Sequence, residues 1–255
     1  MFFYGSTDVG MRRAVNQDNF IIRKYSDDVI FAVVCDGMGG AAGGSIASSA
    51  AVEAFCSQLD DAEATYPLFA DLDEAGLEHI LVGAAEEANH AVYKKAQSDE
   101  ELTGMGTTLV GCIVMPGRIY TVNVGDSRMY MDKGEGMFQV TKDHSYVQYL
   151  VDIGKLSKEE AKVSKKKNII TRAVGTERTV EVDFFVTEYS GSARMLLCSD
   201  GLTNHVEEEE LCELLSKACS EEGIRTACEE MISRANSLGG TDNITAVIIS
   251  VAAEE

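Results

Sequence analysis

The sequence predicts an α+β fold in which a central antiparallel β-sandwich is flanked by pairs of helices on both faces, giving four layers. Helix-like stretches come in two pairs, one towards each end of the chain. Strand-like runs between them are joined by turns as short as Pro116-Gly117. Such turns join antiparallel neighbours, because a parallel crossover needs about a dozen residues or more. The pattern therefore excludes a doubly wound parallel sheet.

The first part of the chain predicts three strands followed by two long helices. Residues that favour strands occupy 2–4, 20–24 and 29–35, and the third run is unbroken and apolar. Small and apolar residues over 45–59 predict a buried helix, followed by a loop over 60–73 with a break at Tyr66-Pro67. A second helix is predicted over 74–98. Its apolar face consists of Leu77, Leu81, Ala84, Ala88 and Ala91.

The second part of the chain predicts mostly short strands with tight connections. The expected strands are 107–115, 118–124, 127–131, 137–141, 180–187, 194–198 and 244–251. Short helices are expected at 146–153 and 158–162, and longer ones at 207–219 and 223–236. The 255 residues are 45% hydrophobic and show no repeat or linker, so we expect one domain over residues 1–255.

The composition narrows the classes of partner. A formal net charge of −20 disfavours nucleic acid and anionic membranes. No run of 18 or more apolar residues and no secretory leader is seen in the sequence. The 7 cysteines lack CxxC spacing, which fits buried free thiols in a reducing compartment. We therefore expect a cytoplasmic monomer.

One segment breaks the acidic trend. Between residues 155 and 172 the basic residues outnumber Glu159 and Glu160. They are Lys155, Lys158, Lys162, Lys165, Lys166, Lys167 and Arg172. The segment either binds an anionic substrate or is an ordinary solvated loop, and the sequence leaves both interpretations open.

Four aspartates lie close to one end of an apolar run, each with a glycine within two positions. They are Asp36, Asp126, Asp200 and Asp242. An Asp before Gly is most often a turn residue. If the strands converge, however, four carboxylates meet, and like charges within a few Å cannot all stay ionised unaided. Hard divalent cations solve this problem because they accept several oxygen ligands. The four segments together predict a two-metal hydrolytic centre.

Seven short motifs are spread along the chain from residue 13 to residue 245. They are Arg13-Ala14-Val15-Asn16-Gln17-Asp18, Asp36-Gly37-Met38-Gly39-Gly40, Met105-Gly106-Thr107-Thr108, Gly125-Asp126-Ser127-Arg128, Thr141-Lys142-Asp143-His144-Ser145, Ser199-Asp200-Gly201-Leu202-Thr203-Asn204 and Gly240-Thr241-Asp242-Asn243-Ile244-Thr245. In type and order these motifs resemble those of the bacterial type 2C, or PPM, family of metal-dependent serine/threonine protein phosphatases. Seven ordered motifs at domain-wide spacing are specific, whereas one Asp-Gly pair is not.

The resemblance implies a site residue by residue. Asp36 would bridge two Mg²⁺ or Mn²⁺ ions, with the Gly37 carbonyl on one of them, and Asp200 and Asp242 would hold the other. Asp126, together with Asp200, would form a weaker third metal site. Arg13 would bind the substrate phosphate. Gln17, Asp18 and Asn243 would surround the ions and order their waters.

The resemblance also implies an activity. The enzyme would hydrolyse phosphoserine and phosphothreonine by in-line attack of a water or hydroxide that bridges the two metals. It would act on phosphorylated proteins, including a cognate kinase, and would oppose a bacterial serine/threonine kinase. A flap over about 145–172 would meet the substrate protein, and it contains the basic segment.

Three departures from the family pattern alter the mouth of the expected site. Met38, as in other bacterial-like sequences, stands where many eukaryotic members have a histidine that is proposed to protonate the leaving group. Ala41 and Ser45 replace a common His and Glu, and Ser164-Lys165-Lys166-Lys167-Asn168 replaces a common His-Pro-Arg. His144 and His205 are candidate acids, although capping or packing explains each more simply.

Two other classes of function are compatible with parts of this pattern. A catalytically dead binding scaffold would usually have lost a metal-binding Asp, and all four are present. A different metal hydrolase, such as a phosphodiesterase, would usually recruit histidines, and the chain has only 4 His with no DxH or HD pair. Both alternatives are weaker than the phosphatase.

Overall fold

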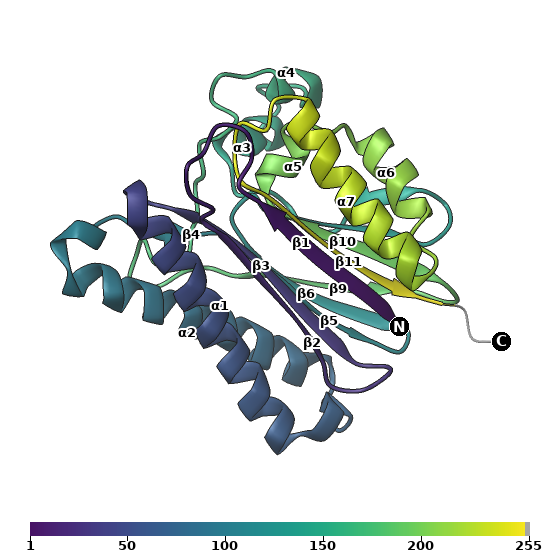
Figure 1. Ribbon diagram of the computed structural model, residues 1–255. Coiled ribbons are helices and arrows are strands. Elements are labelled where there is room, and N and C mark those ends of the chain that lie inside the picture. The colour runs from purple at the N-terminus through teal and green to yellow at the C-terminus, as the bar shows by residue number, and fades with distance from the viewer. Residues whose placement is uncertain (253–255) are drawn as a thin grey trace.

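The structure is a computed structural model that describes residues 1–252, apart from the side chain of residue 41. Two antiparallel sheets stack face to face, and helices cover the outer face of each (Figure 1). The first sheet has the strand order β1 (Phe2–Asp8), β11 (Ile244–Val251), β10 (Ala193–Cys198), β7 (Arg128–Asp132) and β8 (Met137–Gln139). The second has the order β2 (Asp18–Lys24), β3 (Ile30–Met38), β5 (Leu109–Met115), β6 (Arg118–Val124) and β9 (Asp183–Glu188), with β4 (Gly106–Thr107) paired to β3.

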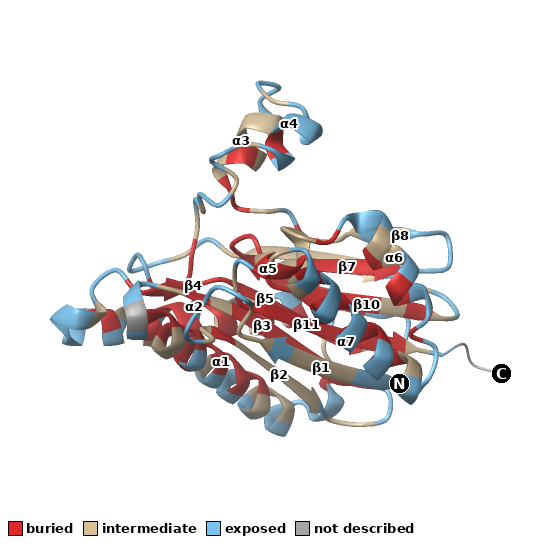
Figure 2. Cartoon of the chain, turned by 45° about the horizontal axis from the view of Figure 1, so that its top comes forward, coloured by how far each residue is buried: buried red, intermediate tan, exposed pale blue. Residues whose placement is uncertain are grey.

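The helices form an outer layer on each side. Helices α1 (Gly40–Thr65) and α2 (Glu74–Ser98) pack on the second sheet, and α6 (Glu208–Ser216) and α7 (Glu221–Ser237) pack on the first (Figure 1). Helices α3 (Tyr146–Asp152) and α4 (Lys158–Lys162) project away from the sandwich (Figure 2). The remaining short helices are η1 (Pro67–Phe69), η2 (Glu100–Leu102) and α5 (Asp200–Thr203).

Three hydrophobic cores separate the four layers. One lies beneath α1 and α2, one between the two sheets, and one beneath α6 and α7. The sequence of strand β3 is continuously apolar because both of its faces are buried. Ile30, Ala32 and Val34 face the other sheet. Phe31, Val33 and Cys35 face the helices. A strand buried on both faces needs no polar alternation. The predicted four-layer α+β fold is confirmed.

Several boundaries differ from the prediction. Helix α1 begins at Gly40 and continues to Thr65, so the predicted loop over 60–73 is wrong for its first residues. The helix continues through this polar stretch because Ala62 still packs against the core. It ends at Tyr66, because the residue before a proline disfavours the helical conformation. The predicted strand over 107–115 is interrupted at Thr108. On α2 the predicted face residue Ala91 is only half-buried, whereas its neighbour Val92 is buried.

Two further predictions from the sequence are buried free thiols and the absence of a long apolar segment. All 7 cysteines are free, and Cys219 is exposed although most of the others are buried. Within residues 1–252 no helix is both long enough and apolar enough to cross a bilayer.

Candidate active site

The topology brings the four aspartates to one end of the sandwich. In the first sheet, β7, β10 and β11 are neighbours, and Asp126, Asp200 and Asp242 lie at the ends of these strands. In the second sheet, β2 and β3 pair so that Asp18 stands opposite Asp36. Burial and the charges of Asp18, Asp200, Asp126 and Asp242 raise the pKa of Asp36 well above its ordinary value. The strand order therefore places all four aspartates at the same end of the sandwich.

Two threonines fix the backbone at Asp36. Its amide N donates to Thr108 Oγ1 at 2.9 Å. Its carbonyl O accepts from Thr107 Oγ1 at 2.8 Å and from the Thr108 amide at 2.9 Å. Thr108 Oγ1 also lies 2.7 Å from Ser127 Oγ, next to Asp126. The interruption between β4 and β5 thus ties Asp36 to the loop of Asp126, a role that sequence reasoning did not assign to these threonines.

Asp18 connects the two sheets beneath the site. Its Oδ2 accepts hydrogen bonds from Ser199 Oγ and Thr245 Oγ1, both at 2.7 Å. Burial raises the pKa of Asp18 to about 6, although these two hydroxyl bonds oppose the shift. Ser199 and Thr245 lie in the motifs that hold Asp200 and Asp242. Asp18 therefore fixes those two motifs against β2.

Asp126 and Asp200 present buried oxygens that lack a donor. Asn204 Nδ2 donates to Asp200 Oδ2 at 2.8 Å. Burial raises the pKa of Asp126 to about 8, and burial together with Asp242 raises the pKa of Asp200. Among the described residues, the buried carboxylate oxygens without a hydrogen-bond partner are Oδ1 of Asp18, Asp126 and Asp200. Such orphaned acceptors are costly unless a cation or water satisfies them.

The donor set fits a hard divalent cation. All the candidate ligands are oxygens, which Mg²⁺ and Mn²⁺ prefer over sulfur or nitrogen. Over residues 1–252, however, no three His, Cys, Asp or Glu side chains stand in a ready-made ligand cage. The fit therefore rests on the chemistry of the donors and on their unpaired buried oxygens. Ions that keep several waters need only a few carboxylates.

The turn after Asp36 is closely packed against α1. A Cβ at Gly37 would lie 2.1 Å from the Gly44 carbonyl oxygen, and one at Gly44 would lie 2.7 Å from the Gly37 carbonyl oxygen. Gln17 Nε2 donates to the Gly40 carbonyl at 2.8 Å, and Ser45 Oγ donates to the Ala42 carbonyl at 3.1 Å. The side chain of Ala41 lies outside the described part of the structure. Only glycine permits this approach of strand end and helix start.

Arg13 points at the cluster, and its neighbour Arg12 remains exposed. Arg13 Nη2 donates to Asp242 Oδ2 at 2.8 Å, and this hydrogen bond raises the pKa of Arg13. The Arg13 side chain as a whole is 51% exposed. A planar cation that is both anchored and accessible suits bidentate contact to a phosphate.

Both candidate histidines hold structural hydrogen bonds. His144 is buried; its Nδ1 accepts from the Gly125 amide at 3.0 Å, and its Nε2 lies 3.2 Å from Asp183 Oδ2. His205 Nε2 accepts from the Thr241 amide at 3.1 Å. Burial lowers the pKa of each imidazole. Neither histidine is free to act as an acid in this arrangement.

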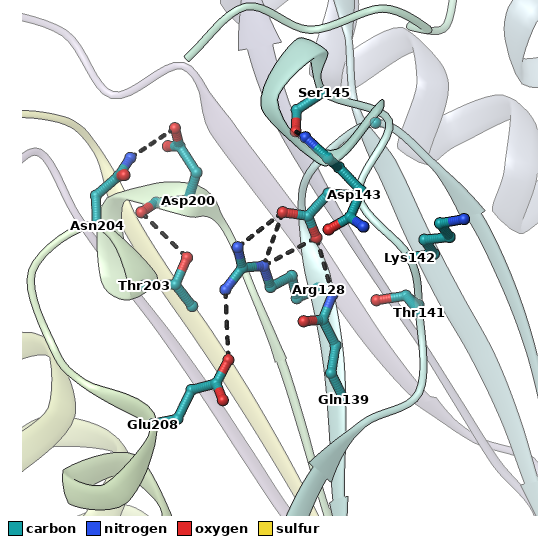
Figure 3. Close-up of polar contacts among 12 residues, drawn as sticks. Arg128, Gln139, Thr141, Lys142, Asp143, Ser145, Asp200, Thr203, Asn204 and Glu208 are labelled. Carbon is teal, nitrogen blue, oxygen red and sulfur yellow. Dashed lines mark hydrogen bonds and ion pairs between the residues drawn. The ribbon is translucent and has the colours of Figure 1, made fainter. Parts of the chain in front are cut away.

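The base of the projecting segment is tied to the site by a partly buried ion pair between Arg128 and Asp143 (Figure 3). Arg128 Nε and Nη2 donate to the Asp143 carboxylate at 2.7–3.1 Å. Gln139 Nε2 also donates to Asp143, at 2.8 Å. A cavity of about 370 Å³ lies between α3–α4 and α5–α6, and Asp126 and Asp200 line it. The projecting segment therefore stands beside the carboxylates and not on a remote face.

Comparison with known proteins identifies the family of the chain. The family model described as "Protein phosphatase 2C" matches residues 11–233. The serine/threonine phosphatase stp of Listeria innocua is 41% identical over 245 residues, which cover 95% of this chain and 93% of that protein. A crystal structure of a bacterial serine phosphatase has a TM-score of 0.85 at 31% identity, covering 99% of this chain and 98% of the other.

A third relative carries metal. The catalytic domain of the serine/threonine protein phosphatase PstP, solved in complex with 2 manganese ions, has a TM-score of 0.80 and is 31% identical. The match covers 98% of this chain and 97% of that domain. With the family model matching most of the chain and these relatives matching nearly all of it, the chain is an enzyme that belongs to the protein phosphatase 2C (PPM) family.

Proposed function

We propose that this enzyme is a metal-dependent protein phosphatase that hydrolyses phosphoserine and phosphothreonine in proteins. The observation that carries the proposal is the placement of Asp36, Asp126, Asp200 and Asp242 at one end of the sandwich, where Asp126 and Asp200 have unpaired buried oxygens and Arg13 is anchored on Asp242. Residues 1–255 would form one phosphatase domain with a flap over about 145–172. The enzyme would act as a cytoplasmic monomer, without nucleic acid or membrane, and would oppose a serine/threonine kinase that is itself among its substrates.

The carboxylates divide into a core and a side position. Asp36, the Gly37 carbonyl, Asp200 and Asp242 would hold two Mg²⁺ or Mn²⁺ ions, and Asp126 with Asp200 would hold a weaker third. When bound, two such ions supply the charge that activates water for in-line attack and neutralises the phosphoryl oxygens.

The chain's own groups orient the substrate and hold the carboxylates. Arg13 would bind the phosphate while its Nη2 remains hydrogen-bonded to Asp242. That hydrogen bond would keep the phosphoryl group above the carboxylate cluster. Thr107 and Thr108 fix Asp36, and Asp18 fixes the motifs of Asp200 and Asp242. Met38 has no proton to give, and both nearby histidines are engaged. The leaving oxygen would therefore take its proton from water.

A substrate panel tests this function against the alternatives. With Mn²⁺ present, we expect turnover of phosphoserine and phosphothreonine peptides and of an aryl phosphomonoester. A phosphodiester should be hydrolysed far more slowly. Turnover of the diester alone would indicate another class of metal hydrolase, and no turnover of any substrate by folded, metal-loaded protein would indicate a binding scaffold.

The flap should contribute to protein substrates more than to small ones. Lys167 lines the cavity beside Asp200, and Lys166 Nζ lies 5.1 Å from the centre of the Tyr146 ring. Neutralising Lys165, Lys166 and Lys167 together should lower kcat/KM for a phosphoprotein, because attraction between the flap and an acidic substrate surface is lost. The aryl phosphate should be much less affected. Equal losses on both substrates would show that these lysines serve structure or chemistry instead.

Asp126→Ala should separate the side position from the core. Asp126 shares only Asp200 with its proposed ion, so that ion should bind more weakly than the core pair. We expect the core ions to remain and kcat to fall most at limiting Mn²⁺. Calorimetric stoichiometry and kcat against Mn²⁺ concentration measure both effects. Loss of all metal would place Asp126 in the core, and no change in either quantity would make it a turn residue only.

A further inference from the structure

The loop that carries Arg13 joins β1 to β2 across the end of the sandwich (Figure 1). Residues 11–15 of this loop are exposed. An exposed loop with a long cationic side chain samples many positions unless its ends are held, and fixing each residue has an entropic cost. The placement of Arg13 therefore depends on what holds the stems of the loop.

A single buried side chain holds both stems. Asn243, only 4% exposed, donates from Nδ2 to the Val9 carbonyl at 2.9 Å and to the Val15 carbonyl at 3.0 Å. Its Oδ1 accepts from the Gln17 amide at 2.9 Å. Both amide protons and the oxygen of Asn243 are thus used on the backbone of one loop. A buried amide with every polar atom satisfied specifies one arrangement strongly.

The residues just before Asn243 complete the contact. The Met11 amide donates to the Gly240 carbonyl at 2.7 Å, and Arg13 Nη2 reaches Asp242 Oδ2 at 2.8 Å. A Cβ at Gly10 would lie 2.1 Å from the Asp242 carbonyl oxygen, so the two segments touch through their backbones. Residues 240–243 therefore form a platform beneath the Arg13 loop.

We infer that Asn243 is a positioning residue for Arg13: it clamps the stems of the 9–17 loop so that the guanidinium stays above the carboxylate cluster. This inference rests on the proposed phosphate-binding role of Arg13 and deepens it. Asn243 would touch neither substrate nor metal, because the bonds above engage all its polar atoms. Its loss should raise KM through disorder of the loop.

Asn243→Asp tests the clamp with almost no change in shape. An aspartate keeps the oxygen that accepts from Gln17, but it replaces both donors with an acceptor that faces the carbonyls of Val9 and Val15. In metal-free protein, trypsin cleavage after Arg12 and Arg13 reports directly on the order of the loop. Relative to cleavage at residues 165–167, which serves as an internal reference, we expect roughly a 10-fold increase. An unchanged ratio would overturn the inference.

Asn89→Asp is the matched control. Asn89 is 2% exposed, and it too donates to two backbone carbonyls, of Glu177 and Arg178, and accepts one amide, from Gly175. It lies on α2, remote in sequence from the Arg13 loop. Its substitution should lower Tm without raising cleavage after Arg12 or Arg13. If both variants raise that cleavage equally, general destabilisation explains the effect and the clamp is refuted.

A double-mutant cycle tests whether Asn243 acts through Arg13. With Mn²⁺ and a phosphopeptide, Asn243→Asp should raise KM about 10-fold with a smaller change in kcat. In an Arg13→Ala background the same change should add little, because the side chain that it positions is already gone. Additive effects would contradict the inference. Asn243→Ser provides a neutral second variant if the aspartate prevents folding.

The phosphate-binding role of Arg13 and the clamp by Asn243 can be refuted separately. If Arg13→Ala leaves KM unchanged, the phosphate-binding role of Arg13 is wrong, while cleavage of metal-free Asn243→Asp still decides whether the loop is clamped. If Arg13→Ala raises KM but Asn243→Asp changes neither cleavage nor KM, the proposed function stands and the clamp does not exist.

Discussion

Replacing Asp36 by Asn should abolish turnover while leaving the protein folded. Asp36 lies in range of the charges of four other aspartates, and it is the expected bridge between two ions. Metal ions stabilise the transition state by several kcal/mol. Losing that stabilisation should lower kcat by roughly 1,000-fold or more. Asp242→Asn should have a similar effect, because it also removes a ligand charge.

Stability separates this effect from misfolding. Neutralising one carboxylate of a buried, like-charged cluster relieves repulsion in metal-free protein, so Asp36→Asn should have an apo Tm at or above that of wild type. Asp132→Asn is the matched control: Asp132 is buried at the other end of β7 and pairs with Arg194 at 3.1 Å. It should lower Tm and leave kcat near wild type. A folded Asp36→Asn enzyme with near wild-type kcat at saturating metal would refute the assignment.

Replacing Arg13 by Ala should raise KM for a phosphopeptide strongly. A charge-assisted hydrogen bond to a phosphate is worth about 1.5–3 kcal/mol. If the contact acts mainly in substrate binding, this corresponds to roughly a 10- to 150-fold increase in KM. Inhibition by inorganic phosphate should weaken in parallel, because the product makes the same contact.

Two further variants control for the charge of Arg13. Arg13→Lys keeps a cation but loses the planar fork, and it should fall between wild type and Ala. Arg12→Ala removes an exposed neighbour with no assigned contact to the cluster and should change KM little. If Arg12→Ala instead carries the loss, the phosphate contact belongs to the other arginine.

Local patterns predicted much of the fold. The element Arg118–Val124 has the predicted bounds because a Pro-Gly turn and a Gly-Asp turn delimit it. Helix α2 also has the predicted bounds, because Asp73 caps its start through a hydrogen bond to Gly76. The predicted boundaries of helices and strands were wrong where tertiary contacts determine the boundary. Helix α1 continues through polar residues on the strength of core packing, and Thr108 leaves its strand to hold Asp36.

The candidate site was predictable in its residue types but not in its connections. Asp residues at strand ends next to glycine indicate a metal centre, and the motifs favoured Arg13 over Arg12. Asn243 donates to the carbonyls of Val9 and Val15, which lie 234 and 228 positions earlier in the chain. No local sequence signal predicts these hydrogen bonds. Nor does spacing show that His144 accepts a hydrogen bond from the Gly125 amide instead of donating a proton to a substrate. Such contacts depend on the register of distant strands.

The most direct test follows metal content and turnover in the same samples. Protein stripped with EDTA is titrated with Mn²⁺ in a calorimeter, and aliquots are assayed with a phosphoserine peptide. We expect no turnover in the stripped protein and full turnover only when the two core ions have bound. Undiminished turnover by exhaustively chelated protein with no bound metal would contradict it.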